Sequence, residues 1–183
     1  MKSSLIVFAS ALLLAATGVF AQAPAPAAAP AAAGPTDAQI AHIVVTANTV
    51  DINAGKLAET KGHSKDVKAF GKMMVTDHSG VNKQAVALVT KLKVTPEDNP
   101  TSQSIKQGGE DNLKNLKGLK GAAFDKAYID HEVAYHQQVL DAVDKVLIPN
   151  AKNAELKSLL EKTRPAFVAH LEKAKSIQAS LGK

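Results

Sequence analysis

Residues 122–147, AAFDKAYIDHEVAYHQQVLDAVDKVL, decide the fold class of this chain. Apolar residues recur in this stretch at spacings of three and four, which places them on one face of a helix. The row consists of Ile129, Val133, His136, Leu140, Val143 and Leu147, widened by Tyr128, Tyr135 and Val139. The stretch therefore predicts a long helix with one buried face, and a histidine lies within that face. Ile148, Pro149 and Asn150 are expected to end it.

Three other stretches show the same period. They are residues 37–61 after the candidate cap Thr36, residues 64–92 with Ser64 as the cap, and residues 154–181 after the candidate cap Asn153. Pro165 lies inside the last stretch and cannot donate a hydrogen bond to the carbonyl of Glu161, so a kink is expected there. Four helices of similar length with apolar faces predict an all-α four-helix bundle.

The connector between the second and third of these helices, residues 94–120, decides the topology. It contains a weaker helix, at about residues 101–117, whose few apolar residues favour a place on the surface. A connector of this length can cross the bundle from end to end. At a rise of about 1.5 Å per residue, such a crossing brings Asp51, His78, His136 and His170 to within about one helical turn of the same level. A short connection would leave His170 more than a turn away, so this agreement favours the crossover.

Three of the six histidines, His78, His136 and His170, each lie in the apolar row of a different long helix. The other three, His42, His63 and His131, lie at a helix start, in a turn and on another face. Carboxylates occur near the same level, and the candidate metal ligands are therefore His78, His136, His170, Asp51, Asp77 and Glu132. Imidazole and carboxylate donors without sulfur suit one divalent ion of Zn, Cu, Fe or Ni.

A metal-free interpretation stays open. Buried histidines commonly form hydrogen bonds within a core, and the nearby carboxylates can be solvated or paired with lysine. The chain would then be a structural or interaction protein of the cell envelope. The sequence leaves the metal, the substrate and the oligomeric state open.

Composition and motifs exclude several other functions. The chain has no cysteine, no Gly-x-Ser-x-Gly elbow, no phosphate-binding Gly-x-x-x-x-Gly-Lys loop and no His-Glu-x-x-His pair. Hydrolytic and nucleotide-dependent activities are therefore not expected, and a non-enzymatic role is favoured. The formal net charge is +5, but the basic residues are spread along the chain and only Arg164 is an arginine. No nucleic-acid partner is expected, whereas anionic partners in the envelope are compatible with this surface.

The N-terminus has the pattern of a secretory signal. Lys2 precedes an apolar stretch at residues 5–19, and cleavage is expected after Ala21, with Ala23 as the alternative site. An Ala/Pro-rich linker, residues 22–35, would follow and lead into one bundle domain, residues 36–183. We therefore expect a periplasmic or secreted protein without a transmembrane segment in its mature part. An uncleaved signal would instead leave an N-terminal anchor.

Four motifs carry a resemblance to a known family. They are Asp51-Ile-Asn-Ala-Gly-Lys-Leu-Ala, Met74-Val-Thr-Asp-His-Ser, Tyr128-Ile-Asp-His-Glu-Val-Ala-Tyr-His136 and Pro165-Ala-Phe-Val-Ala-His170. With their spacing, residues 36–181 resemble the DUF4142 family of exported bacterial proteins, often described as outer-membrane proteins and assigned to the ferritin-like superfamily. The resemblance implies a ferritin-like bundle with a long crossover connector and a short extra helix, but no biochemical activity.

One departure from di-iron ferritins limits what the resemblance implies. Their sites use Glu-x-x-His on two helices, whereas this chain has no Glu-x-x-His, and its acids precede histidine by one residue or by four. Oxygen activation at a di-iron centre is therefore not expected. A site for a single ion is the favoured functional hypothesis.

Overall fold

The computed structural model describes residues 34–182, and all of the regular structure in this range is helical. The predicted signal peptide and almost all of the predicted linker lie outside the described residues. The elements are α1 (Asp37–Lys61), α2 (Lys65–Leu92), α3 (Pro100–Gly118), α4 (Gly121–Ala142), a π-helical turn η1 (Val143–Leu147), α5 (Ile148–Asn150) and α6 (Ala154–Leu181). The all-α prediction is confirmed.

The helix starts follow the predicted capping residues. Thr36 accepts a hydrogen bond from the Gln39 backbone, and the Gln39 side chain accepts one from the Thr36 backbone, which completes a capping box. Ser64 and Asn153 cap α2 and α6 by accepting hydrogen bonds from backbone N–H groups through their side-chain oxygens. Each cap satisfies backbone N–H groups that have no partner within the helix, and this determines where the helix begins.

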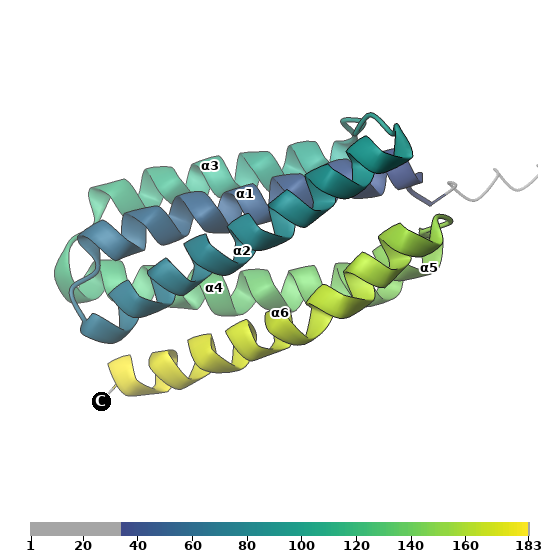
Figure 1. Ribbon diagram of the computed structural model, residues 1–183. Helices are drawn as coiled ribbons and strands as arrows, with labels where there is room; N and C mark the ends of the chain where they lie inside the picture. The colour runs from purple at the N-terminus through teal and green to yellow at the C-terminus, as the bar shows by residue number, and fades with distance from the viewer. Residues whose placement is uncertain (1–33, 183) are drawn as a thin grey trace, which may run out of the picture. The chain divides into compact units, whose positions relative to one another are not determined.

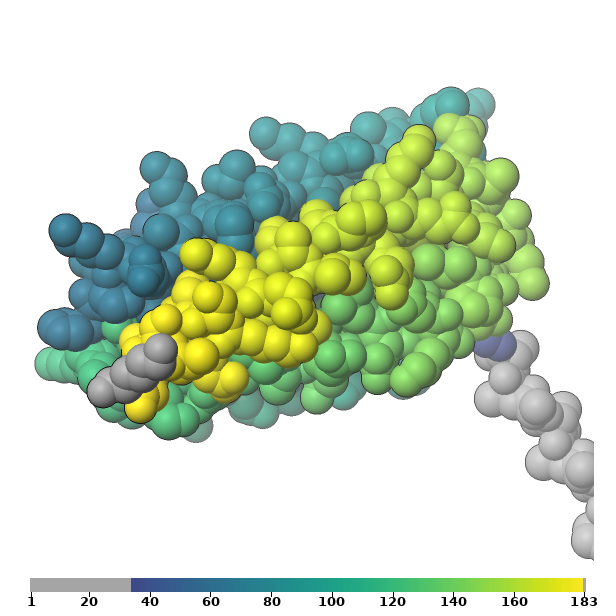
Figure 2. Space-filling model, turned by 90° about the horizontal axis from the view of Figure 1, so that it is seen from below, coloured from purple at the N-terminus to yellow at the C-terminus, as the bar shows by residue number. Residues whose placement is uncertain are grey.

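The connector crosses the bundle, as the level argument predicted. In Figure 1, α1 and α2 form an antiparallel pair, and α3 then runs back along α1 to the end at which α2 began. As a result, α4 starts at that end and runs parallel to α2, and α6 returns antiparallel to α4. Figure 2 shows the face on which α6, in yellow, lies between α2 and α4. The four long helices thus enclose one interior.

The extra helix α3 has 19 residues and packs mainly against α1. Most of its side chains are exposed, as expected, but Leu116 is buried in the core. Gly109 allows the close approach, because a Cβ atom at this position would lie 2.5 Å from Cγ2 of Val50. The connector is therefore a fitted fifth helix rather than a loose segment.

Pro149 and Pro165 have different effects on the helices that contain them. Helical structure ends after Asn150, close to the predicted end, but it arrives there through η1, where the Ile148 N–H donates to the Val143 carbonyl five residues earlier. The sequence period did not indicate this wider turn, which precedes Pro149. At Pro165, by contrast, α6 continues on both sides of the proline, and Figure 1 shows the helix bending partway along its length.

The apolar core has two parts with a polar layer between them. One part, around Phe70, Phe124 and Tyr128, lies toward the α1–α2 turn, and the other, around Ile40, Leu160 and Phe167, lies toward the opposite end. Five buried titratable side chains occupy intermediate positions on the four long helices: Asp51, His78, Glu132, His136 and His170. Burial of polar groups is costly without compensating interactions. A group of buried polar residues in the middle of the bundle is therefore a candidate functional site.

The described helices agree with the predicted absence of a transmembrane segment. Among residues 34–182, none of the helices carries an apolar stretch of the length and hydrophobicity needed to cross a bilayer.

Candidate metal centre

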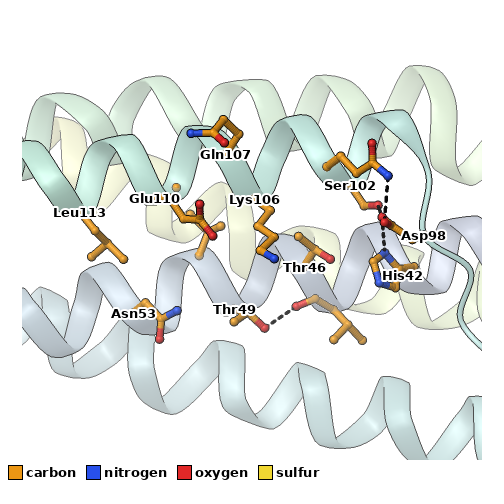
Figure 3. A pocket seen from close by; sticks show the side chains of 14 residues that line it. His42, Thr46, Thr49, Asn53, Asp98, Ser102, Lys106, Gln107, Glu110 and Leu113 are labelled. Atoms are coloured by element: carbon orange, nitrogen blue, oxygen red, sulfur yellow. Dashed lines mark hydrogen bonds and ion pairs between the residues drawn. The ribbon is translucent and has the colours of Figure 1, made fainter.

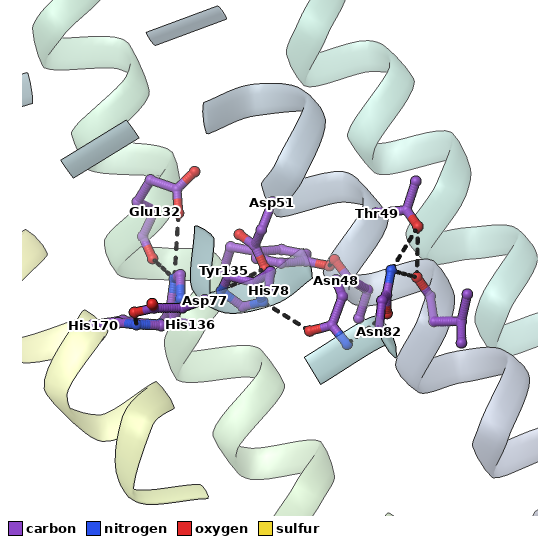
Figure 4. A network of polar contacts seen from close by, with 12 residues as sticks. Asn48, Thr49, Asp51, Asp77, His78, Asn82, Glu132, Tyr135, His136 and His170 are labelled. Carbon is purple, nitrogen blue, oxygen red and sulfur yellow. Dashed lines mark hydrogen bonds and ion pairs between the residues drawn. The ribbon is translucent and has the colours of Figure 1, made fainter. Parts of the chain in front are cut away.

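The three histidines predicted to share a level converge in the bundle interior. His78 from α2, His136 from α4 and His170 from α6 have ring centroids 5.2 to 5.7 Å apart. Each ring offers a nitrogen within 4.8 Å of the nitrogens of the other two. Asp51 from α1 and Glu132 from α4 lie beside them (Figure 4), and all five residues are at most 3 % exposed. We call these five residues the polar cluster.

A chain of amides determines which nitrogen of His78 carries hydrogen. Asn82 Nδ2 donates to the Val45 carbonyl, at 3.5 Å, and to the Thr49 hydroxyl, at 3.4 Å, so its Oδ1 faces Asn48. Asn48 Nδ2 donates to that oxygen at 2.9 Å, which leaves Asn48 Oδ1 to accept from His78 Nδ1 at 2.7 Å. Figure 4 shows this sequence of contacts. His78 is therefore held as the tautomer whose Nε2 keeps a lone pair.

The other two rings are oriented by acceptors of a similar kind. His136 Nδ1 donates to the Glu132 backbone carbonyl at 3.0 Å. His170 Nε2 donates to Asp77 Oδ2 at 2.9 Å. A carbonyl or carboxylate oxygen accepts hydrogen bonds, so each ring directs its hydrogen outward to this partner.

The second nitrogen of each ring, unlike the first, has no hydrogen-bond partner in the described bundle. His78 Nε2, His136 Nε2 and His170 Nδ1 are buried and make no hydrogen bond to any residue of the described range 34–182. We call these three atoms the nitrogen triad. Metal-binding histidines commonly donate their outer N–H to a carbonyl or carboxylate and turn the other nitrogen to the ion. All three rings follow this arrangement.

Two carboxylates supply negative charge beside the triad. Asp51 Oδ2 lies 3.6 Å from His78 Nε2, and Glu132 Oε2 lies 3.3 Å from His136 Nδ1. Asp51, Glu132 and His136 also offer ligand atoms within 4.8 Å of one another. Within residues 34–182, Asp51 Oδ1 and both Glu132 oxygens make no hydrogen bond of good geometry. Buried carboxylates of this kind require a cation or a proton.

The pKa shifts of Asp51 and His136 are in the direction expected for buried carboxylates that lack a cation. Burial, reinforced by the charge of Glu132, raises the pKa of Asp51 well above its usual range. Burial opposes protonation of His136, but contact with Glu132 and the charge of Asp51 outweigh burial and raise its pKa to about 9. Burial and the neighbouring imidazoles lower the pKa of His78 to about 2, and burial also lowers that of His170. These directions favour protonation of His136 and the neutral form of His78 and His170.

The donor set fits a divalent transition ion. Zinc–nitrogen bonds of about 2.0–2.1 Å place the nitrogens of a tetrahedral site roughly 3.3 Å apart. One nitrogen of each of the three rings lies within 4.8 Å of a nitrogen of the other two, so binding of an ion requires ring movements on the order of 1 Å. Asp51 or Glu132 could supply the fourth ligand. An ion there would satisfy buried lone pairs and take over the positive charge of His136.

Five of the six predicted ligands meet in the polar cluster, and the sixth occupies a different place. Asp77 is half-exposed and contacts the outer nitrogen of His170, where it orients the ring and does not face the nitrogen triad. Glu172, which follows His170 closely in sequence, instead pairs with Lys175 at the surface. Residues that follow one another on a helix point in different directions, and this separates the two acids from the interior.

Two functional neighbours were not predicted as part of the site. Asn48 holds the tautomer of His78, and the Phe167 ring stacks on His78 with centroids 5.5 Å apart. Asn48 lies one turn before Asp51 on the buried face of α1, and a buried asparagine within a long helix is a usable signal. Phe167 precedes His170 by three residues, but its apolar position only indicated core packing.

An open hollow with a volume of about 580 Å³ lies between α1 and α3 (Figure 3). His42 stands at one end of it, with Nδ1 3.7 Å from Asp98 Oδ1. Polar residues such as Thr46, Thr49 and Lys106 line it together with the apolar side chains of Val45, Val50 and Leu113. This groove contains no member of the polar cluster, so His42 is separate from the candidate centre.

Comparisons with known proteins agree with this architecture. A DUF305 protein from Streptomyces coelicolor that is inferred to be secreted has a similar structure, with a TM-score of 0.68 and 10% sequence identity; the match covers 80% of this chain and 93% of that one. CopM in its Cu(II)-bound form is also similar, with a TM-score of 0.62 and 13% identity over 80% of this chain and 98% of that one. These identities support similarity of fold alone. No curated protein matches the sequence.

The family comparison covers most of the chain. The sequence profile described as "Domain of unknown function (DUF4142)" matches residues 21–177, which include α1, α2 and α4, most of α6 and the whole polar cluster. The chain therefore belongs to the DUF4142 family.

Proposed function

We propose that this protein binds one divalent transition-metal ion through His78, His136 and His170, with Asp51 or Glu132 as the fourth ligand. The nitrogen triad is the observation that carries the proposal. Three imidazoles from three helices turn their outer nitrogens to Asn48, to a backbone carbonyl and to Asp77. Hydrogen bonding within a core would not require three buried ring nitrogens without a hydrogen-bond partner, on rings that each bring a nitrogen within 4.8 Å of the other two.

Copper(II) is the ion that this donor set is expected to bind most tightly. Sites of nitrogen and oxygen donors follow the order in which Cu(II) exceeds Ni(II) and Zn(II), and the absence of cysteine in the sequence disfavours Cu(I). The similar fold of CopM in its Cu(II)-bound form adds support, because a bundle of this kind can accommodate that ion.

The proposal predicts that chelator-treated protein takes up one Cu(II) per chain. An ion at one hundred times its dissociation constant stabilises the folded state by about 2.7 kcal/mol. For a domain of this size the melting temperature should rise by roughly 5 to 11 °C. Elemental analysis after gel filtration measures the stoichiometry, and electron paramagnetic resonance should show nitrogen hyperfine coupling. Competition with a chromophoric chelator should rank Cu(II) above Ni(II) and Zn(II).

Magnesium provides the control ion, because it prefers oxygen ligands in octahedral geometry and should not raise the melting temperature. Equal melting temperatures with and without Cu(II), Ni(II) and Zn(II), together with metal contents far below one per chain, would reject metal binding. The histidines would then serve the metal-free structural role.

We also propose that the protein is exported and works in the periplasm or outside the cell, because of the signal-like N-terminus and the similar DUF305 protein inferred to be secreted. Mass spectrometry of protein from the expressing cell's periplasm should find an N-terminus at Gln22. A chain that keeps residues 5–20, or that stays in the membrane fraction after cleavage, would contradict this localisation.

A further inference from the structure

An ion that binds at the polar cluster must first pass the packed side chains of the bundle. All five cluster residues are at most 3 % exposed, and the nitrogen triad is buried. His170 lies less deep in the protein than His78 and His136. Its Nε2 donates to an exposed carboxylate, that of Asp77, while its Nδ1 belongs to the triad. At His170, therefore, a single ring separates a surface acid from the triad.

Asp77 is suited to be the first contact of a cation that arrives from solvent. Its side chain is 44 % exposed, and Figure 4 shows it beside the His170 ring. Within residues 34–182, no lysine or arginine forms an ion pair with Asp77, and His170 is its ion-pair partner. Carboxylate oxygens are ligands of divalent ions. Asp77 therefore presents negative charge to the solvent directly in front of the buried site.

Within the described bundle, one hydrogen bond holds the His170 ring, and it is the bond to Asp77. His78, by contrast, is fixed by Asn48 and through it by Asn82. Hydrogen bonds to a charged acceptor are stronger than those to a neutral one. A cation on Asp77 offsets the charge of this acceptor and weakens its bond to the ring. Capture of the ion thus frees the ring to turn about its Cβ–Cγ bond.

The helix that carries His170 also favours such a movement. α6 packs less extensively on α2, the helix of Asp77, than on α4. Pro165 lies five residues before His170 and cannot donate a hydrogen bond to the Glu161 carbonyl, and α6 bends partway along its length (Figure 1). His170 therefore faces the less closely packed side of α6.

From these contacts we propose that Asp77 captures the incoming ion at the surface between α2 and α6, and that the His170 ring then turns to admit it to the polar cluster. This inference rests on the proposed metal-binding function. It adds the route by which the ion enters and gives Asp77 a role in the rate of uptake.

An apolar pocket of about 210 Å³ is the competing route. Residues of α1, α3, α4 and α6 line it together with His78. Most of the lining is apolar, and a divalent cation would lose its hydration there without compensating ligands. The route past Asp77 offers a carboxylate at its outer end, so it has the lower cost of desolvation.

The rate of Cu(II) uptake tests this route. The chain has two tyrosines and no tryptophan, and the ring centroid of Tyr135 lies 6.3 Å from that of His136, so bound Cu(II) should quench tyrosine fluorescence. Stopped-flow mixing of chelator-treated full-length protein with Cu(II) gives the association rate. Asp77→Asn keeps an oxygen that can accept from His170 but loses the charge, and should slow association by about tenfold or more. Asp77→Glu keeps the charge and should keep most of the rate.

Two further variants serve as controls. Glu172→Gln makes the same change of charge at an exposed acid of α6, two residues after His170, where the side chain pairs with Lys175. Ala142→Phe places a ring in the apolar pocket. Both should take up Cu(II) at the rate of the unmodified protein. Circular dichroism checks the fold, and if Ala142→Phe unfolds, the comparison of Asp77→Asn with Glu172→Gln decides.

Three results would overturn the route. They are an unchanged association rate in Asp77→Asn, equal slowing by Asp77→Asn and Glu172→Gln, and slowing by Ala142→Phe while Asp77→Asn is unaffected. A residue that only orients His170 would give the first result, together with faster release of Cu(II) to excess chelator. Any of the three with one Cu(II) bound per chain removes the route and leaves metal binding intact. A protein that binds no Cu(II) at equilibrium rejects both.

Discussion

Replacing His136 with alanine is expected to lower Cu(II) affinity by roughly a hundredfold or more, because loss of an outer hydrogen-bond partner alone costs about 10- to 100-fold. His136 belongs to both groups of potential ligands, the three histidines and the set with Asp51 and Glu132. Its removal leaves two nitrogens of the triad and takes the cationic partner away from the carboxylates. Chelator competition measures the affinity, and the melting temperature of each variant is compared with and without Cu(II).

His63→Ala is the control, because it removes an exposed imidazole from the turn before α2 and leaves the polar cluster intact. This variant should keep the full Cu(II)-dependent rise in melting temperature. His136→Ala will also change the stability of the metal-free protein, since it removes a buried side chain. The metal-dependent rise within each variant is therefore the deciding quantity. A His136→Ala protein that retains this rise would place the ion elsewhere.

Replacing Gly71 with alanine is expected to reduce the free energy of unfolding by about 1–3 kcal/mol, because the added methyl group meets backbone atoms of α1. A Cβ atom at this position would lie 2.7 Å from the Gly55 carbonyl oxygen and 2.9 Å from the Glu59 nitrogen. Neither atom can move without displacing a helix. Urea unfolding of the metal-free protein, followed by circular dichroism, gives the free energy.

Gly80→Ala makes the same chemical change in the same helix and should have the opposite sign. A Cβ atom at Gly80 would have no atom of the described structure within 4 Å beyond its immediate helical surroundings. Alanine there should stabilise the fold by about 0.5–1 kcal/mol, since glycine has the greater conformational freedom in the unfolded chain. Equal effects of the two substitutions would mean that α1 and α2 are not in close backbone contact at Gly71.

The long helices could be predicted from local patterns in the sequence. Hydrophobic period locates the buried faces, and the capping residues Thr36, Ser64 and Asn153 locate the starts, because both depend on residues only a few positions apart. The π-helical turn at Val143–Leu147 was not predicted. Its hydrogen bonds compete closely with those of an α-helix, and packing against neighbouring elements can decide between them.

The polar cluster could be predicted in part. The common level of Asp51, His78, His136 and His170 follows from helix rise once the connector is taken to cross the bundle, and the structure places these residues together. Helix rise did not predict that Glu132 would be buried and Asp77 would not. Both are acids near a histidine, yet Glu132 is buried in the cluster and Asp77 lies half-exposed behind His170.

The sequence by itself therefore determined the class of fold, the helices and the height of each histidine along them, because these depend on local spacing and a fixed rise per residue. Only the tertiary structure decided which atoms face one another. The tautomer of His78 depends on a contact with Asn48, which lies 30 positions away on another helix and is itself oriented by Asn82. An apolar pocket lined by His78 and by residues of α1, α3, α4 and α6 likewise exists only when these helices pack together. Such features arise from the rotation and packing of whole helices, which no local stretch of sequence specifies.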